Sequence, residues 1–371
     1  MGSIPGQGEH WSVFSGTYKI CKLAANVPDL VVFEGLDRPI PDVEHFHGVL
    51  LFADISGISA GKLSKVVMGD HESRYYALIG CAVDEVRKAE GLALANTIIL
   101  SPNAWELCDR DNIVVEQIEN DRAVKVRYIK RDPQFSVEDY TKSFGNHLEY
   151  QEVTIRKTSR LLPNQPLEAV LRKYLLRTVL LKIDDGVPLE YLSEMRPATV
   201  VFVNLQFVEA ATMHNQCQSI QACCLEINNE FKKYQGRINK VFMFDKGCTF
   251  LCCFGLPGDK GEDECANALQ SAHNVHEFCT KIVPSIGIAT GPLFCGVVGH
   301  PLRHEYTVIG RKVNLAARLM MTYPGVVSCD EQTHYHAKMP SSYFSELPKR
   351  AMKGVQNPGP IYQYLSKKHQ K

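Results

Sequence analysis

Two polar residues in the string KVNLAARL could act together on one bound molecule. Asn314 and Arg318 stand four positions apart, and residues at that spacing share one face of a helix. An amide can orient a ligand through hydrogen bonds, and a guanidinium can stabilise negative charge. The alternative is a solvated stripe on an exposed helix, which needs no ligand.

An acidic residue ends the apolar run HGVLLFADISG at residues 47–57. Asp54 lies where that predicted strand ends, and strand-end aspartates either hold a metal ion or cap the helix that follows. The run RPATVVFVNLQF at residues 196–207 has the same pattern, with Asn204 in place of the aspartate. From these residues alone, the metal and the cap are equally open.

Lys240 lies in a strand-like string, NKVFMF. It could face a ligand or be an ordinary exposed strand lysine. Phe242 and Phe244 alternate on one face of that strand, where they could flank a flat ring or belong to the core. His45 and His47 also stand at strand spacing. An edge strand explains that histidine pair better than a metal site does.

The composition is that of a globular protein without a strong electrostatic field. The 371 residues include 41 basic and 41 acidic ones, and 45% are hydrophobic. Charge balance disfavours nucleic acid as a partner, and no apolar run reaches the roughly 18 residues that span a bilayer. The thirteen cysteines include no Cys-x-x-Cys pair, so we expect reduced, mostly buried thiols rather than a zinc site.

Four blocks of sequence recur in the same order, which predicts two copies of one domain. Each copy has an opening strand, an Ile-Gly turn into an amphipathic helix, a second strand and a closing strand. The blocks of the first and second copies are 47–57 and 196–207, 77–89 and 307–319, 97–105 and 325–333, and 121–130 and 349–364.

The two copies differ in length between their first two blocks. Asn204 and Ile309 are 105 positions apart, whereas Asp54 and Ile79 are 25 apart, so the first copy is 80 residues shorter there. The string SKVVMGD at 64–70 aligns with FCGVVGH of the second copy. Skipped exons would explain so clean a join.

The extra segment of the second copy alternates helices and strands. Apolar spacing predicts helices over 217–236 and 263–282, and an Asp-Lys-Gly turn predicts a hairpin over 238–255. Two more strands around a Gly-containing turn are predicted over 283–299. The first copy therefore lacks a helix pair and a central hairpin. A single packed helix over 164–183 is predicted to lead into the second copy.

The strings FADISG, PNAWELCDR, NKVFMFDKGCTFLC, GVVGHPLRHEYTVIGRKVNLAARLMM and KGVQNPGPIYQY resemble the class III nucleotidyl cyclases, in particular their soluble, bicarbonate-responsive branch. The resemblance implies an α+β fold of two ferredoxin-like, pseudo-symmetric mixed-sheet halves, the first truncated. It also implies conversion of ATP to cyclic AMP and pyrophosphate, in cyclic AMP signalling, by in-line attack of the ribose 3′-oxygen. Two Mg²⁺ ions, for which Mn²⁺ can substitute, assist that attack. Ca²⁺ and bicarbonate are implied as modulators.

The same resemblance assigns the base pocket to the second copy. Lys240 would face N1 of adenine as a donor, and Thr307 would accept from the 6-amino group. Guanine reverses that pattern of donors and acceptors, so the pair favours ATP and disfavours a guanylyl cyclase. The backbone of Val308 would lie beside the base, with Phe242 and Phe244 flanking it.

The remaining implied roles are divided between the copies. Asp54 and the backbone carbonyl of Ile55 would hold metal in the first copy. Asn314 would orient the ribose, and Arg318 would stabilise charge on the transferring phosphoryl group. Arg87 matches an arginine that binds bicarbonate, although a surface helix arginine is the simpler reading.

The family's second metal aspartate belongs to the hairpin that the first copy lacks. Two hypotheses therefore stand. One is an adenylyl cyclase of low turnover. The other is a catalytically silent cyclase-homology protein that binds nucleotide or regulates by pairing with another cyclase chain. We expect the protein in the cytoplasm or in another intracellular compartment, because its polar N-terminus lacks the pattern of a secretory signal.

The predicted organisation has five parts. They are a tail over 1–20, a first cyclase-homology domain over 21–139 truncated after Gly57, a connector and helix over 140–195, a complete second domain over 196–365, and a tail over 366–371.

Overall fold

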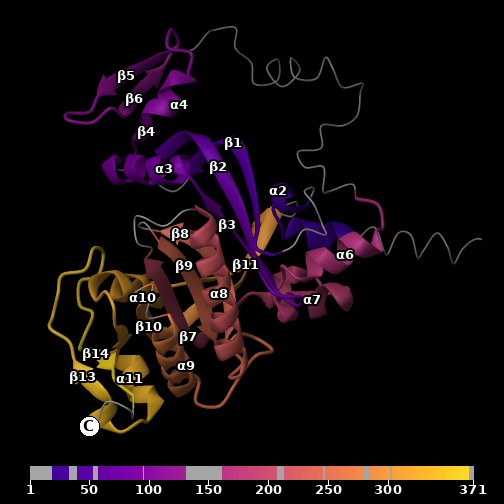
Figure 1. Ribbon diagram of the computed structural model, residues 1–371, viewed down its shortest axis with the longest axis vertical. Coiled ribbons are helices and arrows are strands. Elements are labelled where there is room, and N and C mark those ends of the chain that lie inside the picture. The colour runs from indigo at the N-terminus through magenta and orange to yellow at the C-terminus, as the bar shows by residue number, and fades with distance from the viewer. Residues whose placement is uncertain are drawn as a thin grey trace, which may run out of the picture. The chain divides into compact units, whose positions relative to one another are not determined.

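The computed structural model shows a chain of two compact units (Figure 1). The larger unit contains Met1–Asp42, Val67–Tyr76 and Arg156–Lys371, and the smaller contains Val43–Val66 and Ala77–Ile155. The described residues are 19–32, 40–52, 57–94, 96–130, 161–206, 213–244, 247–279, 282, 284–300 and 303–366. The predicted N-terminal tail and much of the predicted connector lie outside them.

The larger unit is built on an eight-stranded mixed sheet. Seven strands follow the order β13-β14-β12-β10-β7-β9-β8, and β11 pairs with β10. The strands are β7 (Glu194–Gln206), β8 (Arg237–Phe244), β9 (Gly247–Phe254), β10 (Ser285–His300), β11 (Arg303–Ile309), β12 (Val327–Asp330), β13 (Phe344–Glu346) and β14 (Ile361–Tyr364). The helices are α6 (Gln165–Arg172), α7 (Arg177–Asp184), α8 (Met213–Lys232), α9 (Glu264–Phe278), α10 (Arg311–Thr322) and α11 (Glu331–Ala337), with short helical turns at α2 (Asp29–Val32), η2 (Leu189–Leu192) and η4 (Ser341–Tyr343).

Strand β7 is covered on both faces, which explains its unbroken apolar run. Successive side chains of a strand point to opposite faces. Val200 and Phe202 join the large core cluster that includes Leu315 of α10. Thr199 points to the opposite face of the strand, where its hydroxyl contacts the Sγ of Cys265 on α9 at 3.4 Å. A strand sandwiched in this way has no solvent-exposed face, as in other buried sheets.

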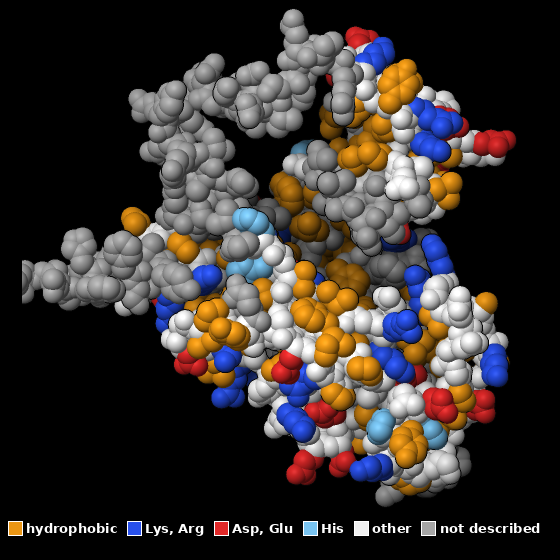
Figure 2. Space-filling model, turned by 180° about the vertical axis from the view of Figure 1, so that it is seen from behind, with side chains coloured by type: hydrophobic (Ala, Val, Ile, Leu, Met, Phe, Trp, Pro, Cys, Tyr) orange, Lys and Arg blue, Asp and Glu red, His pale blue; other side chains and the backbone are white. Residues whose placement is uncertain are grey.

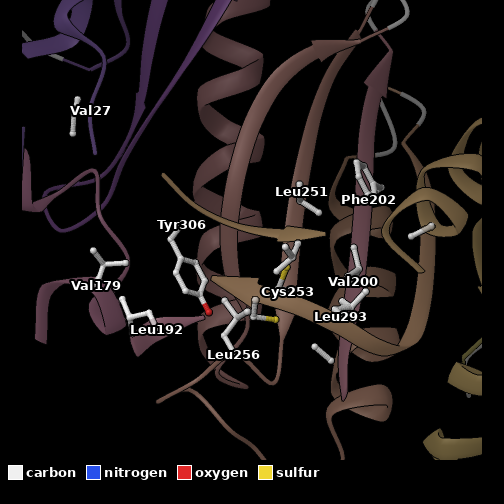
Figure 3. Close-up of a cluster of buried hydrophobic side chains, with 14 of the residues drawn as sticks. Val27, Val179, Leu192, Val200, Phe202, Leu251, Cys253, Leu256, Leu293 and Tyr306 are labelled. Carbon is white, nitrogen blue, oxygen red and sulfur yellow. The ribbon is translucent and has the colours of Figure 1, made fainter. Parts of the chain in front are cut away.

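Strand β11 contributes to the same core. Figure 3 shows Tyr306 of β11 among the side chains of this core, between Leu192 and the β9 residue Cys253. Tyr306 is 7% exposed, and burial raises the pKa of its hydroxyl. The β11 strand is thereby fixed against the sheet by its apolar side chains.

The smaller unit repeats this plan in a shorter form. Its strand order β1-β2-β4-β6-β5, with β3 on β2, corresponds to β7-β10-β12-β14-β13 with β11 on β10. Its elements are β1 (Asp42–Phe52), β2 (Gly57–Gly69), β3 (Arg74–Ile79), α3 (Cys81–Leu92), β4 (Ile98–Leu100), α4 (Pro102–Glu106), β5 (Ile113–Gln117) and β6 (Val124–Ile129). The predicted α+β class is confirmed by these mixed sheets and helices. Within residues 40–130 the described elements include no counterpart of α8, β8, β9 or α9.

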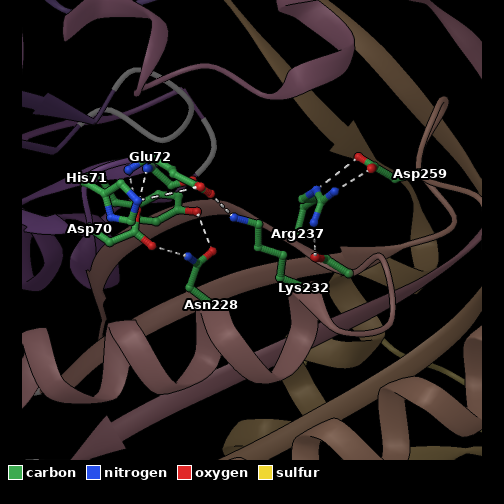
Figure 4. Close-up of polar contacts among 10 residues, drawn as sticks. Asp70, His71, Glu72, Asn228, Lys232, Arg237 and Asp259 are labelled. Atoms are coloured by element: carbon green, nitrogen blue, oxygen red, sulfur yellow. Dashed lines mark hydrogen bonds and ion pairs between the residues drawn. The ribbon is translucent and has the colours of Figure 1, made fainter.

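The tip of the β2–β3 hairpin, Val67–Tyr76, belongs to the larger unit. There the Gly69 N–H donates to Oε1 of Gln221 at 2.9 Å, and Nε2 of Gln221 donates to the Gly69 carbonyl at 2.7 Å. Two helical turns after Gln221 on α8, the Asn228 side chain donates to the Asp70 carboxylate at 3.0 Å (Figure 4). The Gln221 amide thus satisfies both backbone groups of Gly69 as a neighbouring strand would.

Two predicted elements are wrong in detail. The helix expected over 164–183 is two helices, α6 and α7, separated at Lys173. The Lys173 carbonyl accepts from the Arg74 N–H at 2.7 Å, and Leu176 is extended (φ −65°, ψ 144°). The two strands expected over 283–299 are one strand, β10, because its pairing with β7 runs without a break through Gly291.

All thirteen cysteines are free, and ten of them are buried. Burial raises the pKa of Cys295 to about 11 and raises that of Cys253 further. This confirms the expectation of buried thiols. None of the described helices is long and apolar enough to cross a membrane. On the face of the larger unit seen in Figure 2, Lys and Arg side chains lie among Asp and Glu side chains.

Helix α10 approaches strand β10 so closely that only glycine fits between them. A Cβ on Gly287 would lie 2.1 Å from the carbonyl oxygen of Ala316 and 2.5 Å from the nitrogen of Met320. The first copy repeats this contact at Gly57, where a Cβ would lie 2.8 Å from the carbonyl of Val86. Both obstacles are helix backbone, which cannot rotate away as a side chain can.

We predict that Gly287→Ala destabilises the chain by about 2 kcal/mol, because α10 must move away from the sheet. Urea unfolding would measure this. The matched control is Gly91→Ala in α3, where an added Cβ meets nothing within 4 Å. The control should be neutral or up to about 1 kcal/mol more stable, since alanine favours a helix over glycine. Equal stability of the two variants would contradict the close-packing account.

Candidate functional site

A β-bulge places Lys240 on strand β8. The register of β8 against β9 pairs Ile238 with Cys252 and Lys240 with Leu251, so Asn239 is an extra residue. Bulges bend a strand and re-aim the side chains beside them. The Asn239 side chain donates to the carbonyl of Tyr306 on β11 at 3.2 Å. The bulge therefore ties β8 to β11 next to Lys240.

Lys240 points to β11, the strand that carries Thr307. Its Nζ donates to Oε1 of Glu305 at 2.5 Å. Thr307 is two residues further along β11, so its hydroxyl leaves the strand on the same side as the Glu305 carboxylate. Thr307 is 8% exposed and pairs with Gly296 of β10. The structure thus brings together the two residues predicted to read adenine.

The other residues predicted for the base pocket lie on the same two strands. The Phe242 ring packs edge-on against Phe202, with ring centroids 6.3 Å apart. Val308 is 4% exposed and lies in the core cluster. Phe244 ends β8, and its side chain lies outside the described residues.

Asn314 and Arg318 lie on α10, which begins two residues after β11 ends. Asn314 is exposed and Arg318 half-buried. The opposite face of the helix packs into the core through Ala316 and Leu319, both 0% exposed. Asn314 and Arg318 therefore share the outward face of α10. The close contact at Gly287 sets the distance between this helix and the sheet.

A buried ion pair fixes the start of α10. Nζ of Lys312 donates to Oδ2 of Asp330 at 2.5 Å, and Asp330 is 1% exposed. The other carboxylate oxygen accepts from the N–H and hydroxyl of Thr333 at 2.9 and 2.6 Å. Asp330 therefore joins α10, the end of β12 and the start of α11 in one network.

A tyrosine from the first copy's hairpin reaches the neighbourhood of Glu305. Burial raises the pKa of Tyr76; the nearby Arg303 guanidinium opposes this rise and the Glu305 carboxylate adds to it. Nη2 of Arg303 lies 3.8 Å from Oε2 of Glu305. Each oxygen of Glu305 thus has its own cation.

The residues predicted in the first copy are less fully placed. Asp54 and Ile55 lie outside the described residues, so their metal role stays a prediction. Arg87 is half-buried on α3. Among the residues that the structure describes, no three His, Cys, Asp or Glu side chains gather as a metal site. Where the second copy has Asn314 and Arg318, the first has Asp84 and Lys88.

Sequence reasoning missed Glu305 and the bulge at Asn239. A signal for Glu305 was present in the string HEYTVIG, because residues two apart on a strand share a face. No signal marked the bulge, since it depends on how β8 pairs with β9.

Residues 190–367 match the model of the adenylate and guanylate cyclase catalytic domain. This part of the chain is therefore a class III nucleotidyl cyclase domain, as the motifs predicted.

The chain is 47% identical over 318 residues to mouse adenylate cyclase type 10 and 45% identical over 317 residues to the human protein of that name. Both alignments cover 83% of this chain and 20% of the relative. The chain thus spans about a fifth of the length of these curated relatives. Among solved structures, the adenylyl cyclase CyaB from P. aeruginosa has a TM-score of 0.42 at 23% identity, covering 48% of this chain and 97% of that one.

We predict that Lys312→Met lowers the free energy of unfolding by about 2 kcal/mol, because it leaves the buried Asp330 carboxylate without its cation. The control is Lys232→Met, which removes the partner of Glu72 from a pair whose side chains are 43% and 56% exposed. Exposed pairs contribute roughly 0–1 kcal/mol. Urea unfolding midpoints compare the two variants, and similar losses in both would contradict the assigned role of Asp330.

Proposed function

We propose that this chain is an adenylyl cyclase-like enzyme that binds ATP in its second copy and converts it to cyclic AMP and pyrophosphate. The observation that supports this most is the placement of Lys240 against the Glu305–Thr307 side of β11, the strand that leads into the helix carrying Asn314 and Arg318. The relatives are named adenylate cyclase, which agrees with the formation of cyclic AMP, although the chain covers about a fifth of their length.

Each residue has a role in this proposal. Lys240 donates to N1 of adenine and Thr307 accepts from the 6-amino group, which selects ATP over GTP. Asn314 orients the ribose so that its 3′-oxygen faces the α-phosphorus. Arg318 stabilises the charge that builds on the phosphoryl oxygens. The aromatic ring of Phe242 lines the part of the pocket that holds the adenine base.

The metal and the modulators are further parts of the proposal. Class III cyclases use divalent metal ions, and we assign Mg²⁺, or Mn²⁺ in its place, to Asp54 and Ile55. Bound there, such an ion would lower the pKa of the ribose 3′-hydroxyl and offset the charge of the phosphates. Bicarbonate would act through Arg87, with Ca²⁺ as a second modulator. We place the protein in the cytoplasm, where ATP and Mg²⁺ are present.

A second candidate function follows from the missing hairpin of the first copy. Without the second metal aspartate that the family carries there, the chain could bind nucleotide without turning it over. It would then act by pairing with another cyclase chain that supplies the missing half. Among the described elements of residues 57–130 there is no counterpart of β8 and β9, which favours this candidate.

Cyclic AMP formation by the pure chain distinguishes the two candidates. We expect slow, Mg²⁺- or Mn²⁺-dependent conversion of ATP that falls about 100-fold in Arg318→Ala, because that arginine stabilises the transition state. Arg311→Ala is the control, since Arg311 is an exposed arginine at the start of the same helix. A parallel series with bicarbonate tests Arg87 by the variant Arg87→Ala.

The outcomes separate clearly when ATP binding is measured on the same samples. Binding without cyclic AMP would favour the silent candidate. A chain that neither binds ATP nor forms cyclic AMP would overturn both candidates.

A further inference from the structure

Glu305 is an acidic residue of the site that no motif singled out. It stands two residues before Thr307 on β11, and its Oε1 accepts from Nζ of Lys240 at 2.5 Å. The carboxylate, the hydroxyl and the ammonium group therefore share one side of the strand. Any base held by Lys240 and Thr307 also meets the charge of Glu305.

Stability alone does not explain this ion pair. The Lys240 side chain is 32% exposed and that of Glu305 is 43% exposed. Ion pairs at that exposure contribute little to folding, because water screens them and ordering two long side chains costs entropy. The pair is open to solvent, so a ligand can reach it.

The surroundings hold Glu305 more firmly than an isolated surface carboxylate. Oε1 faces Lys240, and Oε2 lies 3.8 Å from Nη2 of Arg303. The Tyr76 hydroxyl lies near both Arg303 and Glu305. A lysine has three N–H donors, so Lys240 keeps two for a ligand after Glu305 takes one.

We propose that Glu305 is the positioning and selectivity residue of the base pocket. Its carboxylate fixes the Lys240 ammonium beside Thr307 and places negative charge at the edge where the base binds. At the 6-position adenine presents an amino donor and guanine presents the O6 acceptor, so a carboxylate that faces this position attracts adenine and repels guanine. The inference rests on the proposed nucleotide site, and its test reads binding rather than turnover.

The test uses the full chain with 3′-deoxy-ATP and 3′-deoxy-GTP, which cannot cyclise, and measures dissociation constants by calorimetry. We expect Glu305→Gln, which keeps the shape and removes the charge, to weaken 3′-deoxy-ATP binding about tenfold. Binding of 3′-deoxy-GTP should stay unchanged or tighten, so the ATP-to-GTP preference falls at least about tenfold.

A double-mutant cycle separates positioning from a general structural effect. If Glu305 acts through Lys240, then Glu305→Gln in a Lys240→Ala background should change 3′-deoxy-ATP binding less than about twofold. The matched control is Glu194→Gln, a strand glutamate of the same sheet that is 49% exposed and 2.8 Å from Arg196. That control should leave both dissociation constants unchanged. Thermal unfolding of each variant confirms that it is folded.

The possible results are distinct. If the wild-type chain binds neither nucleotide, the proposed function itself is contradicted. A wild-type chain that prefers 3′-deoxy-ATP, with Glu305→Gln unchanged in that preference, overturns the role of Glu305 alone. Tighter binding of 3′-deoxy-ATP by Glu305→Gln also overturns it, since Glu305 would then mask Lys240 rather than position it. If Glu305→Gln does not fold, Glu305→Asp replaces it; the shorter carboxylate should weaken 3′-deoxy-ATP binding and keep discrimination against 3′-deoxy-GTP.

Discussion

Strand β10 and helix α10 meet at Gly287 with no side chain between them, and the candidate site depends on that contact. An added Cβ would lie 2.1 Å from a helix carbonyl. Because the helix backbone rests directly on this strand, Asn314 and Arg318 are held at a fixed height above β10. The Lys312–Asp330 pair then fixes the start of the same helix. Backbone packing thus sets the positions at which polar chemistry can occur.

The two copies share this constraint but differ in their polar residues. The helices α3 and α10 have 12 residues each, and Gly57 and Gly287 make the same close approach. The second copy has Asn314 and Arg318 where the first has Asp84 and Lys88. The scaffold is therefore common to both copies, and the residues proposed to bind nucleotide belong to one of them.

Much of the fold and part of the site could be predicted from the sequence. The repeat, the buried strand β7 and the helix face of Asn314 and Arg318 follow from local patterns of apolar and polar residues. The break between α6 and α7 could not be predicted, because it depends on a hydrogen bond from Arg74, about 100 positions away, to Lys173. The pairing of Lys240 with Glu305 likewise depends on how distant strands come together.

The most direct test of the account is a crystal structure of the full chain with 3′-deoxy-ATP and Mg²⁺. We expect adenine to lie between Lys240 and Thr307, with its N1 within hydrogen-bond distance of the Lys240 Nζ and with the phosphates toward Arg318. A nucleotide bound away from β8, β11 and α10, or with its base turned away from Lys240, would contradict it.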